Sequence, residues 1–367
     1  MEFQEVYSCK INNSINSLSP YVGKIRLELA DFLIEKYADK QGLIYDPFMG
    51  SGSVLLQGWS RGYSVIGSDL NYYAYVLSKG KLEHYPTFEE ANKKLTEYRE
   101  YIEKRINDVS LEEIPDWVKQ FFNEQTLKEI CLWTQCLKRN EEWFLLSNLL
   151  GILHHQRPGF LSYPASNGAP YLRDKKYPID EYPEMYAYKN VYEKLQNKVK
   201  RSYQNIPNYN YSIKRYALFG DSTRVQLNNY NISTIITSPP YMKSLTYARD
   251  NRLRLWFLGE EDWKELDKKI SPEKVDFYIL MEKCFKKWAR IQEKGGKCIV
   301  IIGDILVNYN KERLSLSDVM VKMASKYYCL IESFNDPIPE SKKMVKGNNG
   351  IKKEIILVFE RNEKHVR

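Results

Sequence analysis

Two strand–turn–helix units near the start of the sequence constrain the fold most strongly. In the first, a short apolar run at residues 43–45 stops at Asp46, and the small residues 50–53 lead into a helical pattern over residues 54–59. In the second, a strand pattern at residues 64–67 ends at Asp69 and is followed by apolar residues at helical spacing. Strands that alternate with helices in this way predict an α/β fold with a parallel, doubly wound sheet.

The same rhythm returns in the second half of the chain. We expect five more strands there, near residues 216–219, 234–237, 297–302, 328–333 and 354–360, and helices around residues 246–258, 276–292 and 317–325. The last two strands are joined by a Pro- and Lys-rich loop with no helical pattern, which predicts a final antiparallel strand. The expected fold is therefore Rossmann-like, with a seven-stranded, mostly parallel sheet.

Residues 87–211 interrupt this rhythm. They contain amphipathic helical patterns and then an irregular stretch rich in Pro, Tyr and Asn. We interpret residues 1–86 and 212–367 as one catalytic domain and residues 87–211 as an inserted, mainly helical domain.

Composition narrows the function classes. The chain has 367 residues, a formal net charge of +8 and 29 tyrosines, which favours a polyanionic partner such as nucleic acid. The six cysteines are scattered without a C-x-x-C pair, and the histidines lack the spacing of a ligand pair, so we expect reduced thiols and no metal site. No apolar run is long enough to span a bilayer, and we expect a cytoplasmic protein.

The loop at residues 46–52 is the first candidate binding element. It lies where a strand ends and a helix begins, a place where backbone N–H groups and the positive end of the helix dipole converge. A dinucleotide motif would need a third small residue at position 55, which is Leu55, so NAD is disfavoured. The carboxylate of Asp46 suits a ligand with a positively charged end, such as the α-amino group of S-adenosylmethionine.

Two further acids end neighbouring predicted strands. Asp69 could accept hydrogen bonds from ribose hydroxyls, and Asp221 could accept one from an adenine amino group. Either acid alone could be a helix cap or a turn former. Together with Asp46 they would face the same carboxyl edge of the sheet, which favours a binding site.

The segment 237–241, Thr-Ser-Pro-Pro-Tyr, is the candidate for holding the methyl acceptor. Its two prolines have no N–H group, so the rigid main chain presents mainly carbonyl acceptors beside the Ser238 hydroxyl, and Tyr241 offers a ring on which a base can stack. Such a site could bind an exocyclic amine and favour direct methyl transfer. The alternative is that the prolines only terminate a strand.

The loop at residues 46–52 and the segment 237–241 together resemble the bacterial DNA amino-methyltransferases, which methylate cytosine N4 or adenine N6 with S-adenosylmethionine. The serine that opens the Pro-Pro-Tyr motif resembles the cytosine-N4 enzymes more closely. The resemblance implies that the cofactor is bound by Tyr21, Asp46, Phe48, Gly50, Ser51, Gly52, Asp69, Leu70 and Asp221. It implies that the flipped base is held by Ser238, Pro239, Pro240 and Tyr241.

The resemblance also implies a site-specific enzyme acting on a flipped-out base in duplex DNA, within a restriction-modification system that could include a cognate endonuclease. Candidate DNA contacts are Lys243, Arg249 and Arg252 after the motif, and Arg157, Tyr163 and Arg173 in the insert. The charges after the motif could instead be solvated helix residues. Adenine-N6 methylation, RNA base methylation and a catalytically silent DNA-binding protein remain as alternatives.

Overall fold

The structure is a computed structural model that describes residues 6–8, 10–166, 168–240, 247–337 and 353–362. A seven-stranded sheet has the order β3-β2-β1-β4-β5-β9-β8, and a separate two-stranded sheet pairs β6 with β7. The strands are β1 (Leu43–Asp46), β2 (Val65–Asp69), β3 (Arg215–Phe219), β4 (Ile232–Thr237), β5 (Gln292–Gly303), β6 (Leu306–Tyr309), β7 (Glu312–Ser315), β8 (Tyr328–Pro337) and β9 (Lys353–Arg361).

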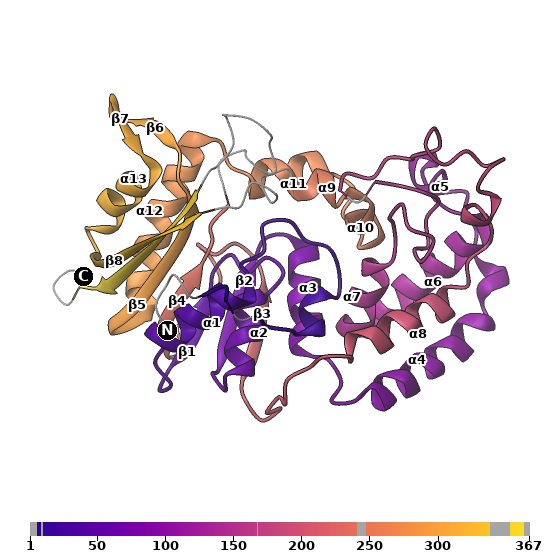
Figure 1. The fold of residues 1–367 in the computed structure, drawn as a ribbon, viewed down its shortest axis with the longest axis horizontal. Helices are drawn as coiled ribbons and strands as arrows, with labels where there is room; N and C mark the ends of the chain where they lie inside the picture. The colour runs from indigo at the N-terminus through magenta and orange to yellow at the C-terminus, as the bar shows by residue number, and fades with distance from the viewer. Residues whose placement is uncertain (1–5, 9, 167, 241–246, 338–352, 363–367) are drawn as a thin grey trace.

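Helices flank the sheet on both faces and extend away from it at one end (Figure 1). Their bounds are α1 (Leu27–Tyr37), α2 (Ser53–Ser60), α3 (Tyr72–Leu82), α4 (Phe88–Glu103), α5 (Asp116–Lys119), α6 (Glu124–Arg139), α7 (Trp143–Gly151), α8 (Val191–Ser202), α9 (Tyr247–Asp250), α10 (Arg252–Phe257), α11 (Trp263–Ile270), α12 (Lys274–Ile291) and α13 (Leu316–Ala324). Short 3-10 helices lie at η2 (Ser14–Ser17), η3 (Ile106–Asp108) and η4 (Pro183–Met185). Among the described residues, no helix is both long and apolar enough to cross a membrane.

The predicted sheet is confirmed. β1 is parallel to β2 and β4, β2 is parallel to β3, and β4 is parallel to β5. The last strand in the chain, β9, is antiparallel to both of its neighbours, and it lies between β5 and β8. The strand order reverses between β1 and β4, and in open α/β sheets the crevice beyond the carboxyl ends of the strands at such a point is where ligands bind.

Alternating side chains of the strands divide the sheet's core into two layers. On β1, Ile44 belongs to the apolar cluster that includes α1, α2 and α3, whereas Tyr45 belongs to the cluster that includes α12 and α13. On β2, Val65 and Ile66 divide in the same way. Both faces of the sheet are therefore covered, as a parallel sheet requires.

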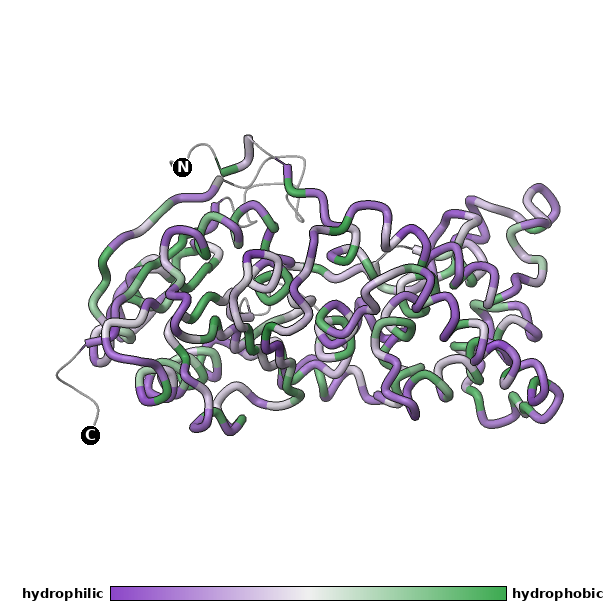
Figure 2. Tube along the Cα trace, turned by 90° about the horizontal axis from the view of Figure 1, so that it is seen from below, coloured by the Kyte–Doolittle hydropathy of each residue, from purple (hydrophilic) through white to green (hydrophobic). Residues whose placement is uncertain are grey.

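A helical part built from α4, α6, α7 and α8 extends from the sheet end of the molecule, and apolar and polar stretches alternate along its helices (Figures 1 and 2). It lies between α3 and β3 in the chain. The assignment of residues 87–211 as a separate inserted domain stays a prediction.

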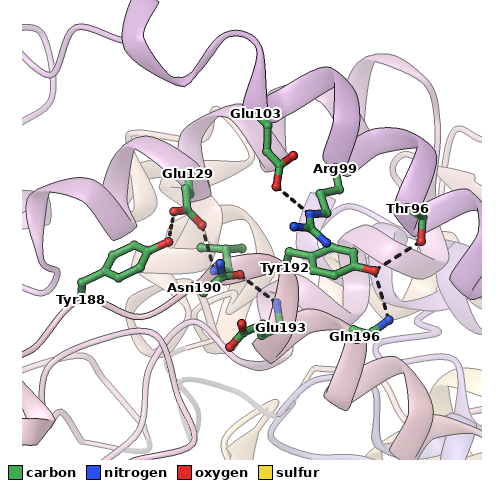
Figure 3. A network of polar contacts seen from close by, with 10 residues as sticks. Thr96, Arg99, Glu103, Glu129, Tyr188, Asn190, Tyr192, Glu193 and Gln196 are labelled. Carbon is green, nitrogen blue, oxygen red and sulfur yellow. Dashed lines mark hydrogen bonds and ion pairs between the residues drawn. The ribbon is translucent and has the colours of Figure 1, made fainter.

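A network of polar contacts joins three helices of this part (Figure 3). Glu129 of α6 accepts hydrogen bonds from the Tyr188 hydroxyl and, at 2.9 Å, from the Val191 backbone N–H. The Tyr192 hydroxyl on α8 lies 3.3 Å from Thr96 Oγ1 on α4. Because these contacts are shared by α4, α6 and α8, the helical part is held together by more than its apolar core.

The N-terminal segment before α1 contacts both parts of the molecule. The Ser14 N–H donates to the Asn205 carbonyl at 2.7 Å, and the Asn205 N–H donates to Ser14 Oγ at 3.2 Å, just beyond the end of α8. Further along, Arg26 Nη2 lies 2.7 Å from a carboxylate oxygen of the buried Asp336 on β8. The segment therefore links the helical part to the edge of the sheet.

The structure also corrects details of the predicted elements. The single helix expected over residues 246–258 is two short helices within the described part of that range, α9 and α10. The helices α1 and α11 and the β6–β7 hairpin were not predicted.

Candidate active site

A pocket lies at the carboxyl edge of the sheet, beyond β1, β2 and β4, where the strand order reverses. It brings together eight of the predicted site residues: Tyr21, Phe48, Gly50, Asp69, Leu70, Asp221, Ser238 and Pro240. A second, smaller depression adjoins it and is lined by Asp46, Ser51 and Ser238 together with Phe48 and Gly50. The loop after β1 and the segment after β4 therefore form one site.

A buried hydrogen bond joins these two segments. Thr237 Oγ1 at the end of β4 donates to Asp46 Oδ1 at the end of β1 across 2.7 Å, although 191 positions separate the residues. The second donor to the same carboxylate oxygen is the Phe48 backbone N–H, at 3.2 Å. These two donors fix the direction of the Asp46 carboxylate.

The Asp46 carboxylate is almost completely buried. Burial raises its pKa from the ordinary value of 3.8 to about 7, because a buried charge loses its hydration. The hydrogen bonds from Thr237 and Phe48 act in the opposite direction and lower the pKa. A strongly raised pKa in a cleft is typical of functional sites. A cationic ligand would stabilise the ionised form.

The Asp69 carboxylate shapes the turn of the loop after β1. It accepts hydrogen bonds from the Gly50 backbone N–H at 2.9 Å and from the Asn71 backbone N–H at 2.8 Å. Burial raises its pKa to about 6, while these backbone donors lower it. Asp69 therefore holds the loop after β1 in place and also lines the pocket.

The tight turn of this loop depends on two glycines in the left-handed region. Gly50 has φ +49°, and a Cβ there would lie 3.2 Å from the Tyr21 ring. Gly52 has φ +71° and precedes α2, and a Cβ there would lie 2.7 Å from Ser78 Oγ. Any side chain at position 50 would press on a ring that lines the pocket.

Aromatic rings form one wall of the pocket. The Tyr21 and Tyr247 rings are roughly parallel, with centroids 6.1 Å apart and an interplanar angle of 27°, and Tyr21 also packs against Tyr73. Burial raises the pKa of Tyr21 well above its ordinary value, so the phenol stays neutral. These rings offer flat apolar surface beside the two carboxylates.

The remaining predicted site residues are placed as follows. Asp221 Oδ1 accepts hydrogen bonds from the Thr223 N–H and hydroxyl, at 2.8 and 2.7 Å. Pro239 is buried and lines neither depression, and Gly52 shapes the turn without lining the pocket. Tyr241 and Lys243 lie outside the described residues.

The predicted DNA-binding residues that the structure describes do not line this pocket. Arg249 is half-exposed and pairs with Asp250 at 3.5 Å. Arg252 Nη2 donates to the Pro170 carbonyl at 2.7 Å, so it connects α10 to the irregular stretch of the helical part.

Three predicted contacts lie in the helical part itself. Arg173 Nη1 donates to Gln156 Oε1 at 2.5 Å, and the Tyr163 ring packs against Tyr186. Arg157 is exposed and lines a separate depression together with Lys198. Their role as DNA contacts stays a prediction.

Sequence reasoning missed several pocket residues. Asn71, Ser222, Tyr247, Lys269, Ile270 and Leu280 all line it. Asn71 directly follows Leu70, and Ser222 directly follows Asp221. Both therefore lie just beyond a strand end, and the expectation that ligands bind at the carboxyl ends of the strands could have identified them. Lys269 and Ile270 are the last two residues of α11, and no local sequence pattern predicts that they line a pocket at the edge of the sheet.

The side chains fit a cofactor with a positive end, hydroxyl groups and a flat ring. Asp46 can face the cation, Asp69 and Asp221 offer acceptors for hydroxyl or amino hydrogens, and Tyr21 and Tyr247 supply aromatic surface. Within the described ranges, no group of three or more His, Cys, Asp or Glu side chains could hold a metal ion.

Two curated relatives are similar in sequence. The Type II methyltransferase M.BsoBI of Geobacillus stearothermophilus is 25% identical over 290 residues, which cover 70% of this chain and 55% of the relative. The Type II methyltransferase M.MjaII of Methanocaldococcus jannaschii is 31% identical over 71 residues, which cover 19% of this chain and 13% of the relative. The chain therefore spans 55% and 13% of the lengths of these two relatives.

Solved methyltransferase structures align over most of the chain. TrmN from Thermus thermophilus has a TM-score of 0.36 and 10% identity, and the alignment covers 95% of this chain and 52% of that one. A SAM-dependent methyltransferase from Methanosarcina mazei has a TM-score of 0.35 and 10% identity, and the alignment covers 89% of this chain and 96% of that one.

The family model of the D12 class N6 adenine-specific DNA methyltransferases matches residues 27–238, from the start of α1 to the serine after β4. The match contains the loop after β1, Asp69 and Asp221. It confirms the resemblance to DNA amino-methyltransferases, but it names adenine N6 and does not support the expected closeness to the cytosine-N4 enzymes. Because the match covers more than half of the chain, this protein belongs to the D12 class N6 adenine-specific DNA methyltransferase family.

Proposed function

We propose that this protein transfers the methyl group of S-adenosyl-L-methionine directly to an exocyclic amino nitrogen of a base in duplex DNA. The observation that carries the proposal is the shared pocket of the loop after β1 and the segment after β4, joined by the hydrogen bond from Thr237 to Asp46. One segment has the chemistry to hold a cation, and the other has the chemistry to hold an amine.

S-adenosyl-L-methionine is the cofactor of this family, and when bound it supplies an electrophilic methyl group. In this chain, Asp46 would face the positive end of the cofactor and Asp69 would accept hydrogen bonds from its hydroxyl groups. Asp221 would accept a hydrogen bond from its adenine amino group, and the rings of Tyr21 and Tyr247 would exclude water from one side of the cofactor.

The amine is oriented by acceptors after β4. Pro239 and Pro240 have no N–H group that could compete with the amine for an acceptor, and the Ser238 hydroxyl lies in the same pocket. These groups would accept hydrogen bonds from the amino group and so direct its nitrogen lone pair toward the methyl group. As the nitrogen–methyl bond forms and the sulfur–methyl bond breaks, the same oxygens would stabilise the positive charge that develops on the nitrogen. The nitrogen would then lose its proton to solvent, and the thioether product of the cofactor would leave.

Two bases are candidates, and each has its own supporting observation. The family match favours adenine N6. The serine at position 238, where an aspartate is the more frequent residue of the adenine enzymes, favours cytosine N4. Both amines fit the same acceptors, so the base has to be identified chemically.

We further propose that the enzyme acts on a flipped-out base at specific sites, as part of a restriction-modification system. Both curated relatives are named as Type II methyltransferases, which supports this assignment. Residues 87–211, with Arg157, Tyr163 and Arg173, would then form the domain that reads the DNA sequence.

The test is methylation of plasmid DNA by purified protein and S-adenosyl-L-methionine, followed by mass analysis of the nucleosides. We expect N6-methyladenine or N4-methylcytosine, and the product identifies the base. The variants Asp46→Asn and Ser238→Ala should each lower the rate at least tenfold. Methylation of RNA in place of DNA, or tight DNA binding with no methyl transfer by the wild type, would overturn the proposal.

A further inference from the structure

Two depressions outside the active-site pocket join into one basic groove between the N-terminal segment and α8. One is lined by residues 10–14, by parts of residues 16–28 and by α8, and the other by residues 17–20, residues 157–160 and α8. They share Ser17, Lys24, Lys198 and Arg201. We call this surface the basic groove and define it by its cations Lys10, Lys24, Arg26, Arg157, Lys198 and Arg201.

The central cations of the basic groove are not neutralised by acids. Lys24 Nζ donates to the carbonyls of Asn16 and Ser19, at 3.1 and 3.3 Å, and Lys198 Nζ donates to the Ser17 carbonyl at 2.7 Å. Within the described part of the chain, neither lysine forms an ion pair with a carboxylate, and the same holds for Arg201.

The electrostatics reflect this imbalance. Burial lowers the pKa of Lys24 to about 8. The pKa of Lys198 is also lowered to about 8, first by burial and then by repulsion from Arg201 and Lys24. Behind the groove, the fully buried Lys81 Nζ donates to Asn16 Oδ1 at 2.8 Å, and burial together with repulsion from Lys24 lowers the pKa of Lys81 well below its ordinary value. An anion in the groove would relieve the repulsion among these cations.

A purely structural role for the lysines explains only part of this arrangement. Cations that bond to carbonyls near the end of the short η2 helix do stabilise it. Carbonyl oxygens bring partial charge, however, and Arg201 is exposed and adds a full positive charge beside them. Among the described residues that line the groove, one acid is present, Glu28, and its Oε1 accepts from the Ile11 backbone N–H at 3.0 Å.

The basic groove begins at the active site. Lys24 also lines the small depression that contains Gly50 and Ser238, next to the pocket of the proposed reaction. From there the groove continues along α8 to the loop that carries Arg157. It therefore leads from the reacting position toward the helical part.

We propose that the basic groove binds the phosphodiester backbone of duplex DNA beside the flipped base, with Lys198 and Arg201 as phosphate contacts and Lys24 at the end nearest the active site. This inference rests on the proposed function for its choice of DNA. A backbone contact made by lysine and arginine positions DNA without reading its sequence. It also makes the affinity depend on salt concentration, because neutralised phosphates release counterions.

The test compares Arg201→Gln and the double variant Lys198→Gln/Arg201→Gln with the wild type. Lys200→Gln is the matched control, because Lys200 is exposed on the same helix and lines neither depression. The affinity for a 30-base-pair duplex is measured by fluorescence anisotropy between 50 and 300 mM salt. Cofactor affinity by calorimetry and methyl transfer are measured on the same preparations.

We expect the slope of log affinity against log salt to become shallower by about 0.9 in the single variant and about 1.8 in the double variant. Lys200→Gln should keep the wild-type slope, Arg201→Lys should restore it, and cofactor affinity should be unchanged in all variants. An unchanged slope in the single and double variants would overturn the groove assignment, and so would a wild type that binds duplex RNA in preference to DNA through the same residues.

The outcomes separate this inference from the proposed function. If the wild type methylates DNA but the slopes do not change, the groove assignment is wrong and the proposed function stands. If the slopes change as expected but no methyl transfer occurs, the groove assignment stands and the proposed function is wrong.

Discussion

Thr237 donates a hydrogen bond to Asp46 across 2.7 Å, which couples the end of β4 to the end of β1 inside the core of the site. The donor stands one residue before Ser238, and the acceptor opens the glycine-containing loop. This contact, together with the parallel pairing of β1 and β4, fixes the relative position of the two segments that the proposed reaction brings together.

Thr237→Val should weaken cofactor binding at least tenfold. The change keeps the shape of the side chain but removes a donor to a buried carboxylate, and such a bond contributes about 1.5–3 kcal/mol. It should also raise the pKa of Asp46 above its value of about 7, because the bond from Thr237 lowers that pKa. Calorimetry with S-adenosyl-L-methionine measures the affinity. Thr237→Ser keeps the hydroxyl and should bind nearly as the wild type does; equal affinity of the Val variant would contradict the coupling.

Asp46→Asn should gain stability relative to the wild type as the pH rises. Burial raises the pKa of Asp46 from 3.8 in the unfolded chain to about 7 in the fold. Between these values the folded state binds more protons than the unfolded state, so the wild type loses stability with rising pH, and the loss is complete above about pH 7. The variant lacks this titration. The difference in Tm between variant and wild type should therefore grow from pH 5 to pH 8, and a constant difference would contradict the raised pKa.

Gly50→Ala should lower cofactor affinity more than it lowers stability. At φ +49° an alanine is strained, and its Cβ would lie 3.2 Å from the Tyr21 ring that lines the pocket. Gly62→Ala is the matched control, since Gly62 also has positive φ (+85°) but nothing within 4 Å of a Cβ. Both variants should be destabilised by about 1–2 kcal/mol and should therefore unfold at a lower temperature. Calorimetry should find weaker cofactor binding in Gly50→Ala but not in Gly62→Ala. Equal cofactor affinities of the two variants would contradict a contact between Tyr21 and the cofactor.

Tyr247→Ala should raise the KM for the cofactor, whereas Tyr247→Phe should leave it nearly unchanged. The ring of Tyr247 lines the pocket and packs in parallel with Tyr21 at 6.1 Å, so the flat surface matters more than the hydroxyl. An aromatic contact of this kind contributes about 0.5–1.5 kcal/mol, equivalent to a change of roughly two- to tenfold. Steady-state kinetics at saturating DNA measures the effect. A larger loss in Tyr247→Phe than in Tyr247→Ala would show that the hydroxyl is the contributing group.

Local patterns were sufficient to predict the sheet and most of its helices. β1 and β2 are short apolar runs closed by Asp46 and Asp69, and each is followed by a helix with clear periodicity. The β6–β7 hairpin was missed because its turn has no glycine signal. Asn310 and Lys311 both have positive φ, at +50° and +68°, where a hairpin turn usually has Asn-Gly.

The candidate site was predictable where its residues end strands. Asp46, Asp69 and Asp221 follow three strands whose carboxyl ends meet at one edge, so the rule for parallel sheets places them together. Lys269 reaches the pocket from α11 and lies about fifty positions from the nearest strand-end acid in the chain, so its contribution depends on packing that no local pattern encodes. The basic groove was missed for the same reason, because Lys24 and Lys198 meet only in the folded chain.

The pair of hydrogen bonds between Ser14 and Asn205 has a mechanical consequence. Because these two hydrogen bonds attach the N-terminal segment to the chain just beyond the end of α8, a movement of that helix on ligand binding would also displace residues 14–17. The same stretch of backbone runs on to Tyr21, whose ring forms part of the pocket wall. Binding of DNA against the outer helices would then be coupled through this segment to closure of the pocket around the cofactor.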